Sequence, residues 1–325
     1  MAITPNQLGV FKPKFNNDAS TNGGIATLNQ LSSGVRNSIF SDLANDSSLA
    51  GATEVRKVFI KQNLQVLDAS AYGDASVFMK DIGDSDINFL LGYGTETDSG
   101  VNPTLDIMVG RVVNVGASYV DIETPLVKTG VITVTRFRPN TGSVVEVADA
   151  SANASGNYCR LTNVQTSSFS VGDVITEKKV FELPLPDDKA NLKPRVRDLS
   201  VSSAGTFNVS AVSFAPRAAV TGVVNLELIS GSSYSWNIPD LNLNGVASLD
   251  EDLSVYHPET SAQTNAALVL KIPSSAFEGV WASGNTVDFT IVSGSIPLWL
   301  KRVVSDNPNV AGTQAVNFGV KYQTS

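Results

Sequence analysis

The sequence predicts a mainly β protein built from more than one domain. The chain has 325 residues, which exceeds one ordinary domain, so two or three hydrophobic cores are expected. Hydrophobic residues make up 42% and charged residues 17% of the chain, a balance typical of folded proteins. Short alternating segments separated by turn residues recur along most of the chain, and such a series makes antiparallel sandwiches the default architecture.

The first 24 residues are expected to form an extended arm. Pro5, Pro13 and the polar run over 16–22 interrupt any regular pattern there. Three scattered hydrophobic residues could anchor this arm, namely Val10, Phe11 and Phe15.

One short helix is predicted after the arm. Thr27 is a suitable N-cap, and hydrophobic residues follow it at spacings of three and four. These residues are Leu28, Leu31, Val35 and Ile39. A second short turn is predicted over 47–50, ending at Gly51.

Strands are predicted near both ends of the chain. Residues 55–67 alternate, and the pattern assigns their side chains to two opposite faces of a sheet. One face has Val55, Lys57, Phe59 and Lys61, and the other has Arg56, Val58 and Ile60. Further strands are expected over 75–80, 87–91, 287–292, 298–304 and 315–322.

Motifs at the two chain ends carry a family resemblance. Gly23-Gly24 and Arg56-Lys57-Val58-Phe59-Ile60-Lys61-Gln62-Asn63 lie near the start, and Trp299-Leu300-Lys301-Arg302-Val303-Val304 lies near the end. Together they resemble an uncharacterised family of tailed-bacteriophage virion proteins with a Gly-Gly start, an Arg-Lys-x-(Phe/Tyr)-hydrophobic-Lys-Asn strand and a closing Trp-x-(Lys/Arg)-Arg-x-Val strand. Val55 stands where that pattern has an aromatic residue. The resemblance covers the two ends and not the middle, and it implies a structural part of a phage particle.

The resemblance also implies how the chain is divided. Because the terminal motifs occur together in that family, we expect residues 25–104 and 280–325 to form one Ig-like antiparallel β-sandwich. The rest is then an insertion between its strands. In an assembled particle, the arm at residues 1–24 is expected to order on a neighbouring subunit.

The insertion is predicted to contain two further β units joined by a linker. Residues 105–182 are expected to form a small β-barrel from five strands, over 107–115, 119–123, 131–137, 158–161 and 174–178. Residues 183–193 begin Leu-Pro-Leu-Pro and form a Pro-rich linker. Residues 194–279 are expected to form a second β-sandwich, with strands over 199–201, 207–214, 222–229, 233–238 and 267–272.

The formal net charge of −8 argues against direct nucleic-acid binding, which needs a broad basic field. The densest basic stretch has Lys189, Lys193, Arg195 and Arg197. Aspartates flank it and no aromatic residue is interleaved, so a solvated linker or an ion-pairing contact is predicted. No apolar run reaches the length of a membrane helix, and residues 1–6 lack the pattern of a secretory signal, so no membrane contact is expected.

Single titratable residues give weak signals for chemistry. Cys159 alternates with its neighbours like a strand residue and is predicted to be a small packed side chain. It excludes an intramolecular disulfide and fits assembly in a reducing compartment. His257, the single histidine, precedes a proline and is predicted to lie in a surface loop.

Two acidic clusters are candidates for a hard cation. One contains Asp81, Asp84 and Asp86, and the other contains Asp250, Glu251 and Asp252. Converging carboxylates could hold Ca²⁺, but neither spacing matches an EF-hand, so turn-forming aspartates are the favoured interpretation. We therefore predict no catalytic, cofactor-binding or metal-binding residue.

The sequence thus favours a virion structural protein, not an enzyme, that assembles in the bacterial host cytoplasm. Its expected partners are other copies of itself and other virion proteins. The tail or neck is the preferred location, and a capsid decoration protein is the alternative. A module of the tail that binds a host receptor or glycan is the alternative of another class.

Overall fold

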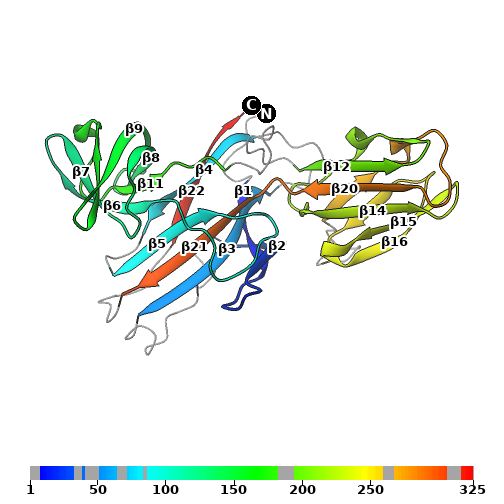
Figure 1. Ribbon diagram of the computed structural model, residues 1–325, viewed down its shortest axis with the longest axis horizontal. Helices are drawn as coiled ribbons and strands as arrows, with labels where there is room; N and C mark the ends of the chain where they lie inside the picture. The colour runs from blue at the N-terminus through cyan, green and yellow to red at the C-terminus, as the bar shows by residue number, and fades with distance from the viewer. Residues whose placement is uncertain are drawn as a thin grey trace.

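The computed structural model describes residues 8–32, 39–40, 51–63, 72–82, 86–181, 194–258, 267–305 and 316–324. These residues form three β units in a row (Figure 1). A barrel lies at one end, a central unit carries strands from both ends of the chain, and a third unit lies at the other end. The prediction of a mainly β chain with several sheets is confirmed.

The central unit has two layers. The first is a five-stranded sheet in the order β2-β1-β3-β21-β5, and the second is the antiparallel pair β4–β22. Their bounds are β1 Leu8–Phe15, β2 Gly23–Gln30, β3 Ala52–Gln62, β4 Tyr72–Asp81, β5 Ile87–Tyr93, β21 Ile296–Val304 and β22 Asn317–Thr324. Side chains such as Val58, Met79 and Leu298 join the two layers in one buried cluster. The strand predicted over 55–67 is confirmed as β3 up to Gln62, and both of its faces are buried from Val55 onwards.

Strands β1 and β2 occupy segments of the chain that were predicted to be an arm and the start of a helix. Leu8–Phe15 is β1, which pairs with both β2 and β3, so this part of the chain is a sheet strand and not an arm. Thr27 lies within β2, where its hydroxyl donates to the Lys12 carbonyl across the β1–β2 pair instead of capping a helix. Phe11, Ala26 and Phe59 form a small buried cluster that holds this pairing. The rest of the predicted helix over 33–38 and the turn over 47–50 lie outside the described residues.

The predicted barrel is confirmed, and it closes with six strands instead of five. Its order is β10-β7-β6-β11-β8-β9. The bounds are β6 Val109–Val115, β7 Tyr119–Glu123, β8 Gly130–Arg138, β9 Ser143–Ser155, β10 Tyr158–Thr162 and β11 Val174–Glu177. The missed strand, β9, has few large hydrophobic residues, and Ala150 and Ala152 are its buried contributions to the barrel core. The predicted linker over 183–193 lies outside the described residues.

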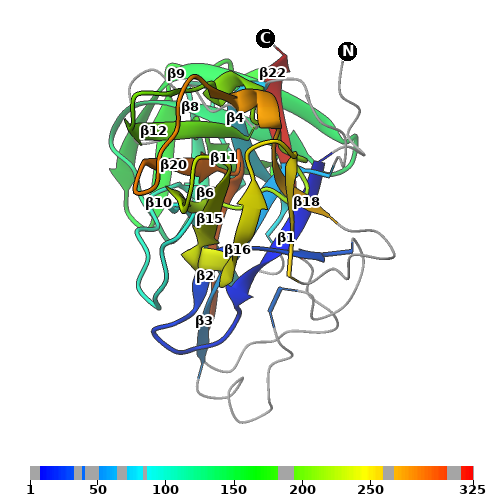
Figure 2. The same cartoon turned by 90° about the vertical axis from the view of Figure 1, so that its right-hand side faces the viewer.

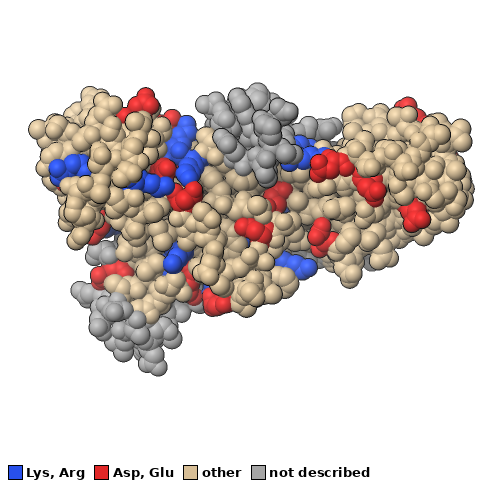
Figure 3. All heavy atoms as spheres, in the orientation of Figure 1, with Lys and Arg blue, Asp and Glu red and all other residues tan. Residues whose placement is uncertain are grey.

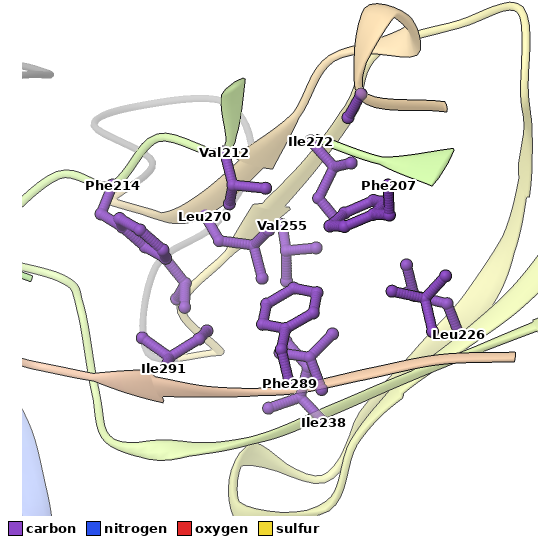
Figure 4. Close-up of a cluster of buried hydrophobic side chains, with 14 of the residues drawn as sticks. Phe207, Val212, Phe214, Leu226, Ile238, Val255, Leu270, Ile272, Phe289 and Ile291 are labelled. Carbon is purple, nitrogen blue, oxygen red and sulfur yellow. The ribbon is translucent and has the colours of Figure 1, made fainter. Parts of the chain in front are cut away.

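The third unit contains a five-stranded sheet in the order β12-β20-β14-β15-β16. Its bounds are β12 Arg195–Ser202, β14 Gly222–Leu228, β15 Ser233–Ile238, β16 Leu243–Ser248 and β20 Thr286–Val292. Two short antiparallel pairs accompany it, β13 (Thr206–Phe207) with β19 (Phe277–Glu278), and β17 (Leu253–Tyr256) with β18 (Leu268–Ile272). Figure 4 shows how Phe289, Ile291 and Ile238 of the large sheet face Val255 and Leu270 of the β17–β18 pair.

Two predictions are corrected by this unit, one on the placement of a strand and one on the existence of a strand. The strand expected in the terminal sandwich over 287–292 is β20, which lies between β12 and β14 because its inward side chains complete the core of the third unit. The strand predicted over 207–214 is mostly absent, since Thr206–Phe207 is followed by a single 3₁₀ turn at Val209–Ala211. The strands β16, β17 and β19 were not predicted.

Candidate functional site at the junction of the chain ends

The terminal motifs meet in the central sheet. β3 and β21 pair antiparallel, and their register places Lys57 directly opposite Trp299. On its other side, Trp299 lies opposite Gly92 of β5. The two motifs that support the family resemblance are therefore neighbours in space, although they lie near opposite ends of the sequence.

Lys57 is the centre of this junction, and its side chain is fully buried. Its Nζ donates to the carbonyl oxygens of Gly24 (2.9 Å) and Asp98 (2.8 Å), and it lies 2.6 Å from Asp98 Oδ1. The same nitrogen lies 4.7 Å from the ring centroid of Phe59 and 5.6 Å from that of Trp299, within cation–π range. Burial lowers the pKa of Lys57, while the hydrogen bond and the charge of Asp98 oppose this shift.

Asp98 links the motifs because it also binds Trp299. The indole Nε1 donates to Asp98 Oδ2 at 2.8 Å, and the backbone N–H of Gly24 donates to the Asp98 carbonyl at 2.9 Å. Gly23 has a φ of +105°, and a Cβ there would lie 2.9 Å from both the Asp98 carbonyl oxygen and the Trp299 ring. The Gly-Gly motif is thus explained by backbone conformation and by close packing on the tryptophan.

A neighbouring ion cluster uses the remaining basic residues of the motifs. Arg56 and Arg302 both pair with Glu54, and Arg56 also pairs with Asp18. The Arg302 guanidinium lies 5.0 Å from the ring centroid of Phe40. Both arginines are buried, so their charges are compensated within the fold.

This junction fixes structure and does not present reactive groups to a substrate. The Lys57 ammonium has acceptors within the protein, and its side chain has no exposed surface. A buried cation with bound partners ties together the segments that contain them. The site therefore joins the β1–β2 turn, the loop after β5 and strands β3 and β21 into one body.

A second polar cluster connects the central unit with the third unit. Glu96 follows β5 and is almost fully buried. Its carboxylate accepts hydrogen bonds from the hydroxyls of Thr221, Ser293 and Ser295, and from the Ser295 N–H at 3.2 Å. Nearby, Lys61 Nζ donates to the Ala219 carbonyl at 3.4 Å. These bonds join two units by side chains from distant parts of the sequence.

The barrel is joined to the other side of the central unit. The Met79 N–H donates to Thr176 Oγ1 at 2.9 Å, and the Tyr93 hydroxyl donates to the Lys179 carbonyl at 2.8 Å. Lys321 of β22 reaches Glu146 of β9 at 2.6 Å. A cleft of about 490 Å³ at this junction is lined by Lys80, Asp81, Arg111, Phe137, Pro139, Gly172, Val174 and Asn317.

The other residues singled out from the sequence lie apart from the junction. Cys159 is fully buried in the barrel core, as predicted, and burial raises the pKa of its thiol. His257 was predicted to be a surface residue and is instead 3% exposed. Its backbone N–H donates to the Ala267 carbonyl at 2.9 Å, which extends the β17–β18 pairing by one residue.

The acidic clusters do not converge in the part of the chain that the structure describes, where no group of three potential metal-ligating side chains occurs. Asp252 pairs with Lys271 at 2.8 Å and accepts from the Ser274 N–H at 2.9 Å, contacts that account for its lowered pKa. Asp84 lies outside the described residues. In the basic stretch, Arg195 and Arg197 belong to β12, and Lys189 and Lys193 lie outside the described residues.

Comparisons with protein-family models, curated proteins and solved structures find no match. Among the described residues, none of the helical segments has the length and hydrophobicity required to cross a membrane.

The packing of Gly23, Lys57 and Trp299 was not predictable as a cluster from strand periodicity. The signal that could have found it is the presence of lysines in β3, on a face that also has Phe59.

Proposed function

We propose that this chain is a structural component of a tailed-bacteriophage particle and acts through contacts between subunits, in the tail or neck. The observation that carries this proposal is the junction of Gly23, Lys57, Asp98 and Trp299. The motifs that resemble the virion family meet there in a buried, mutually bonded cluster. This arrangement supports an architectural role for the motifs, because their polar groups are used to hold segments together.

The arrangement of the units supports the same proposal. Three β units in a row (Figure 1) offer separate surfaces to other copies of the chain and to other virion proteins. We further propose that the two layers of the central unit correspond to the Ig-like sandwich expected from the sequence, with the barrel and the third unit inserted between its strands. The buried thiol of Cys159 fits assembly in the host cytoplasm.

Immunogold electron microscopy of purified virions, with an antibody raised against this chain, tests the proposal. Labelling along the tail, at its end or at the neck is the expected result. Uniform labelling over the head would replace the tail or neck with a capsid decoration role. An absence of labelling, with an antibody that binds the native protein in a control, would contradict a structural role in the virion.

A further inference from the structure

We propose that β16 is an assembly edge at which a second copy of this chain pairs, strand against strand, around a two-fold axis. This inference rests on the proposed function because it names one of its subunit contacts. Among the residues that the structure describes, β16 pairs with β15 alone and ends the five-stranded sheet. Its outer row of backbone N–H and C=O groups is therefore available to another strand. Figure 2 looks onto this end of the molecule, with β15 and β16 towards the viewer.

The sequence of β16 lacks the devices that usually protect a sheet edge. Protected edges carry charged residues, prolines or bulges. The strand reads LNGVAS, with no charged residue and no proline, and its six residues pair with β15 without a register shift. Val246 is 68% exposed, so the strand presents an apolar side chain to solvent at this edge.

The edge is held in position by the core of its own unit. Leu243 and Ala247 pack against the buried cluster from the inner face of the sheet. Gly245 lies beneath the ring of Trp236, since a Cβ there would be 2.9 Å from that ring. A preformed strand loses little conformational entropy when another strand binds to it.

The opposite edge of the same sheet is protected. β12 carries Arg195, Arg197 and Asp198, and its pairing with β20 has a register shift between Arg197 and Ser200. Asp198 has a φ of +53°, so the strand departs from regular geometry in the region of this irregularity. The contrast within one sheet indicates that the neutral, regular β16 edge is the one suited to pairing.

A second copy fits this edge better than a charged partner. In a two-fold pairing each strand meets itself in antiparallel orientation, so any charge near the axis faces its own copy. With the axis at Val246, that residue lies opposite Val246 of the partner subunit, and Asn244 lies opposite Ser248 of the partner subunit. All these side chains are uncharged, and the two sheets join into one continuous sheet.

The charges around the edge predict how salt affects the pairing. Figure 3 shows that the surface of the third unit is largely uncharged in this view, with separate acidic side chains. Asp240 precedes β16, and Asp250 and Glu251 follow it. With the axis at Val246, Asp240 of one copy lies at the same end of the paired strands as Asp250 and Glu251 of the partner subunit, and salt screens repulsion between exposed charges. Dimerisation should therefore strengthen as the ionic strength rises.

Analytical ultracentrifugation of the purified full chain over a series of protein concentrations tests the inference. The wild type should form a dimer, and Val246→Lys should weaken dimerisation roughly tenfold or more because two lysines then meet at the axis. Val223→Lys is the matched control, since Val223 is 42% exposed on the interior strand β14 of the same sheet. This control should dimerise like the wild type. Circular dichroism and thermal unfolding establish that each variant is folded.

Asn244→Asp provides a second variant if Val246→Lys does not fold, because Asn244 is exposed on the same strand. An aspartate there lies opposite Ser248 of the partner subunit and close to Asp250 of the partner subunit, so like charges repel. A wild-type protein that stays monomeric at every concentration would overturn the inference. So would a folded Val246→Lys or Asn244→Asp protein that dimerises as tightly as the wild type. Virion labelling by the antibody, together with a monomeric wild type, would leave the proposed function standing and remove only the β16 contact. Dimerisation through β16 without virion labelling would support the β16 contact and contradict the proposed function.

Discussion

Lys57 and Trp299 lie directly opposite each other across the β3–β21 pair and bind the two oxygens of one carboxylate. Lys57 Nζ is 2.6 Å from Asp98 Oδ1, and Trp299 Nε1 is 2.8 Å from Asp98 Oδ2. The loop that contains Asp98 is thereby attached to strands from both ends of the chain. Because each bond depends on the position of the others, the cluster should respond to mutation as a unit.

Replacing Lys57 with methionine should strongly destabilise the central unit. The substitution leaves Asp98 with one of its two side-chain partners and removes the lysine donor from the part-buried carbonyl groups of Gly24 and Asp98. A loss of about 1.5–3 kcal/mol is expected, the range for hydrogen bonds to a charged group. Chemical denaturation measures the free energy of unfolding. Lys301→Met is the control, since Lys301 is a lysine of the closing motif that is only partly buried. Equal losses for the two variants would contradict a special role for Lys57.

Replacing Gly23 with alanine should destabilise the fold more than replacing Gly130. Gly130 is the matched control because its φ of +98° is close to the +105° of Gly23, so both alanine variants bear similar backbone strain. Only Gly23 packs against the Trp299 ring and the Asp98 carbonyl, and nothing lies within 4 Å of a Cβ at Gly130. We expect Gly23→Ala to cost about 1–3 kcal/mol more from overpacking. Thermal unfolding of the two variants measures this difference, and the same melting temperature for both would refute the packing argument.

The sequence predicted the β class, a small barrel and the strand β3, because these depend on local alternation and turn residues. It did not predict that β20 belongs to the third unit. That placement depends on which core the strand completes, a long-range property that periodicity does not contain. The helix prediction at Thr27 failed for a related reason, since pairing with β1 overrode a spacing that also fits a helix.

The candidate site was predictable only in its parts. The terminal motifs identified Gly23, Lys57 and Trp299, but Asp98 belongs to no motif and joins the cluster through tertiary contacts. His257 was placed wrongly because its neighbouring proline suggests a loop, whereas its backbone continues the β17–β18 pairing and the residue is buried. Contacts between units, such as those of Glu96, have no local sequence signal.

Replacing Glu96 with glutamine should loosen the connection between the central and third units. The neutral amide keeps the size of the side chain but accepts hydrogen bonds less strongly, and bonds to charged groups contribute about 1.5–3 kcal/mol each. We expect a lower melting temperature and a broader distribution of shapes by small-angle X-ray scattering. Glu227→Gln, on the exposed face of β14, should match the wild type. An unchanged scattering profile and melting temperature for Glu96→Gln would argue against this link.

The stability of the barrel should depend on acid pH through Asp121. The hydrogen bond from Arg160 is the main cause of the lowered pKa of this carboxyl, and Asn114 also donates to it. Because the pKa of this carboxyl in the folded state lies below its ordinary value, the ionised form stabilises the fold at any pH above the ordinary value. This contribution is lost as the pH falls through the folded-state pKa. The advantage of the wild type over Asp121→Asn should therefore be present at neutral pH and vanish in strong acid. A difference in unfolding free energy that is constant over this range would contradict the assignment.

The proposed function makes this chain a repeated structural part of a phage particle. Cryo-electron microscopy of purified virions tests it most directly, with mass spectrometry of the same particles to identify their proteins. We predict peptides from this chain and symmetry-related density in the tail or neck that fits the barrel, the central unit and the third unit. Particles that contain no peptide of this chain and no density matching these units would contradict the claim.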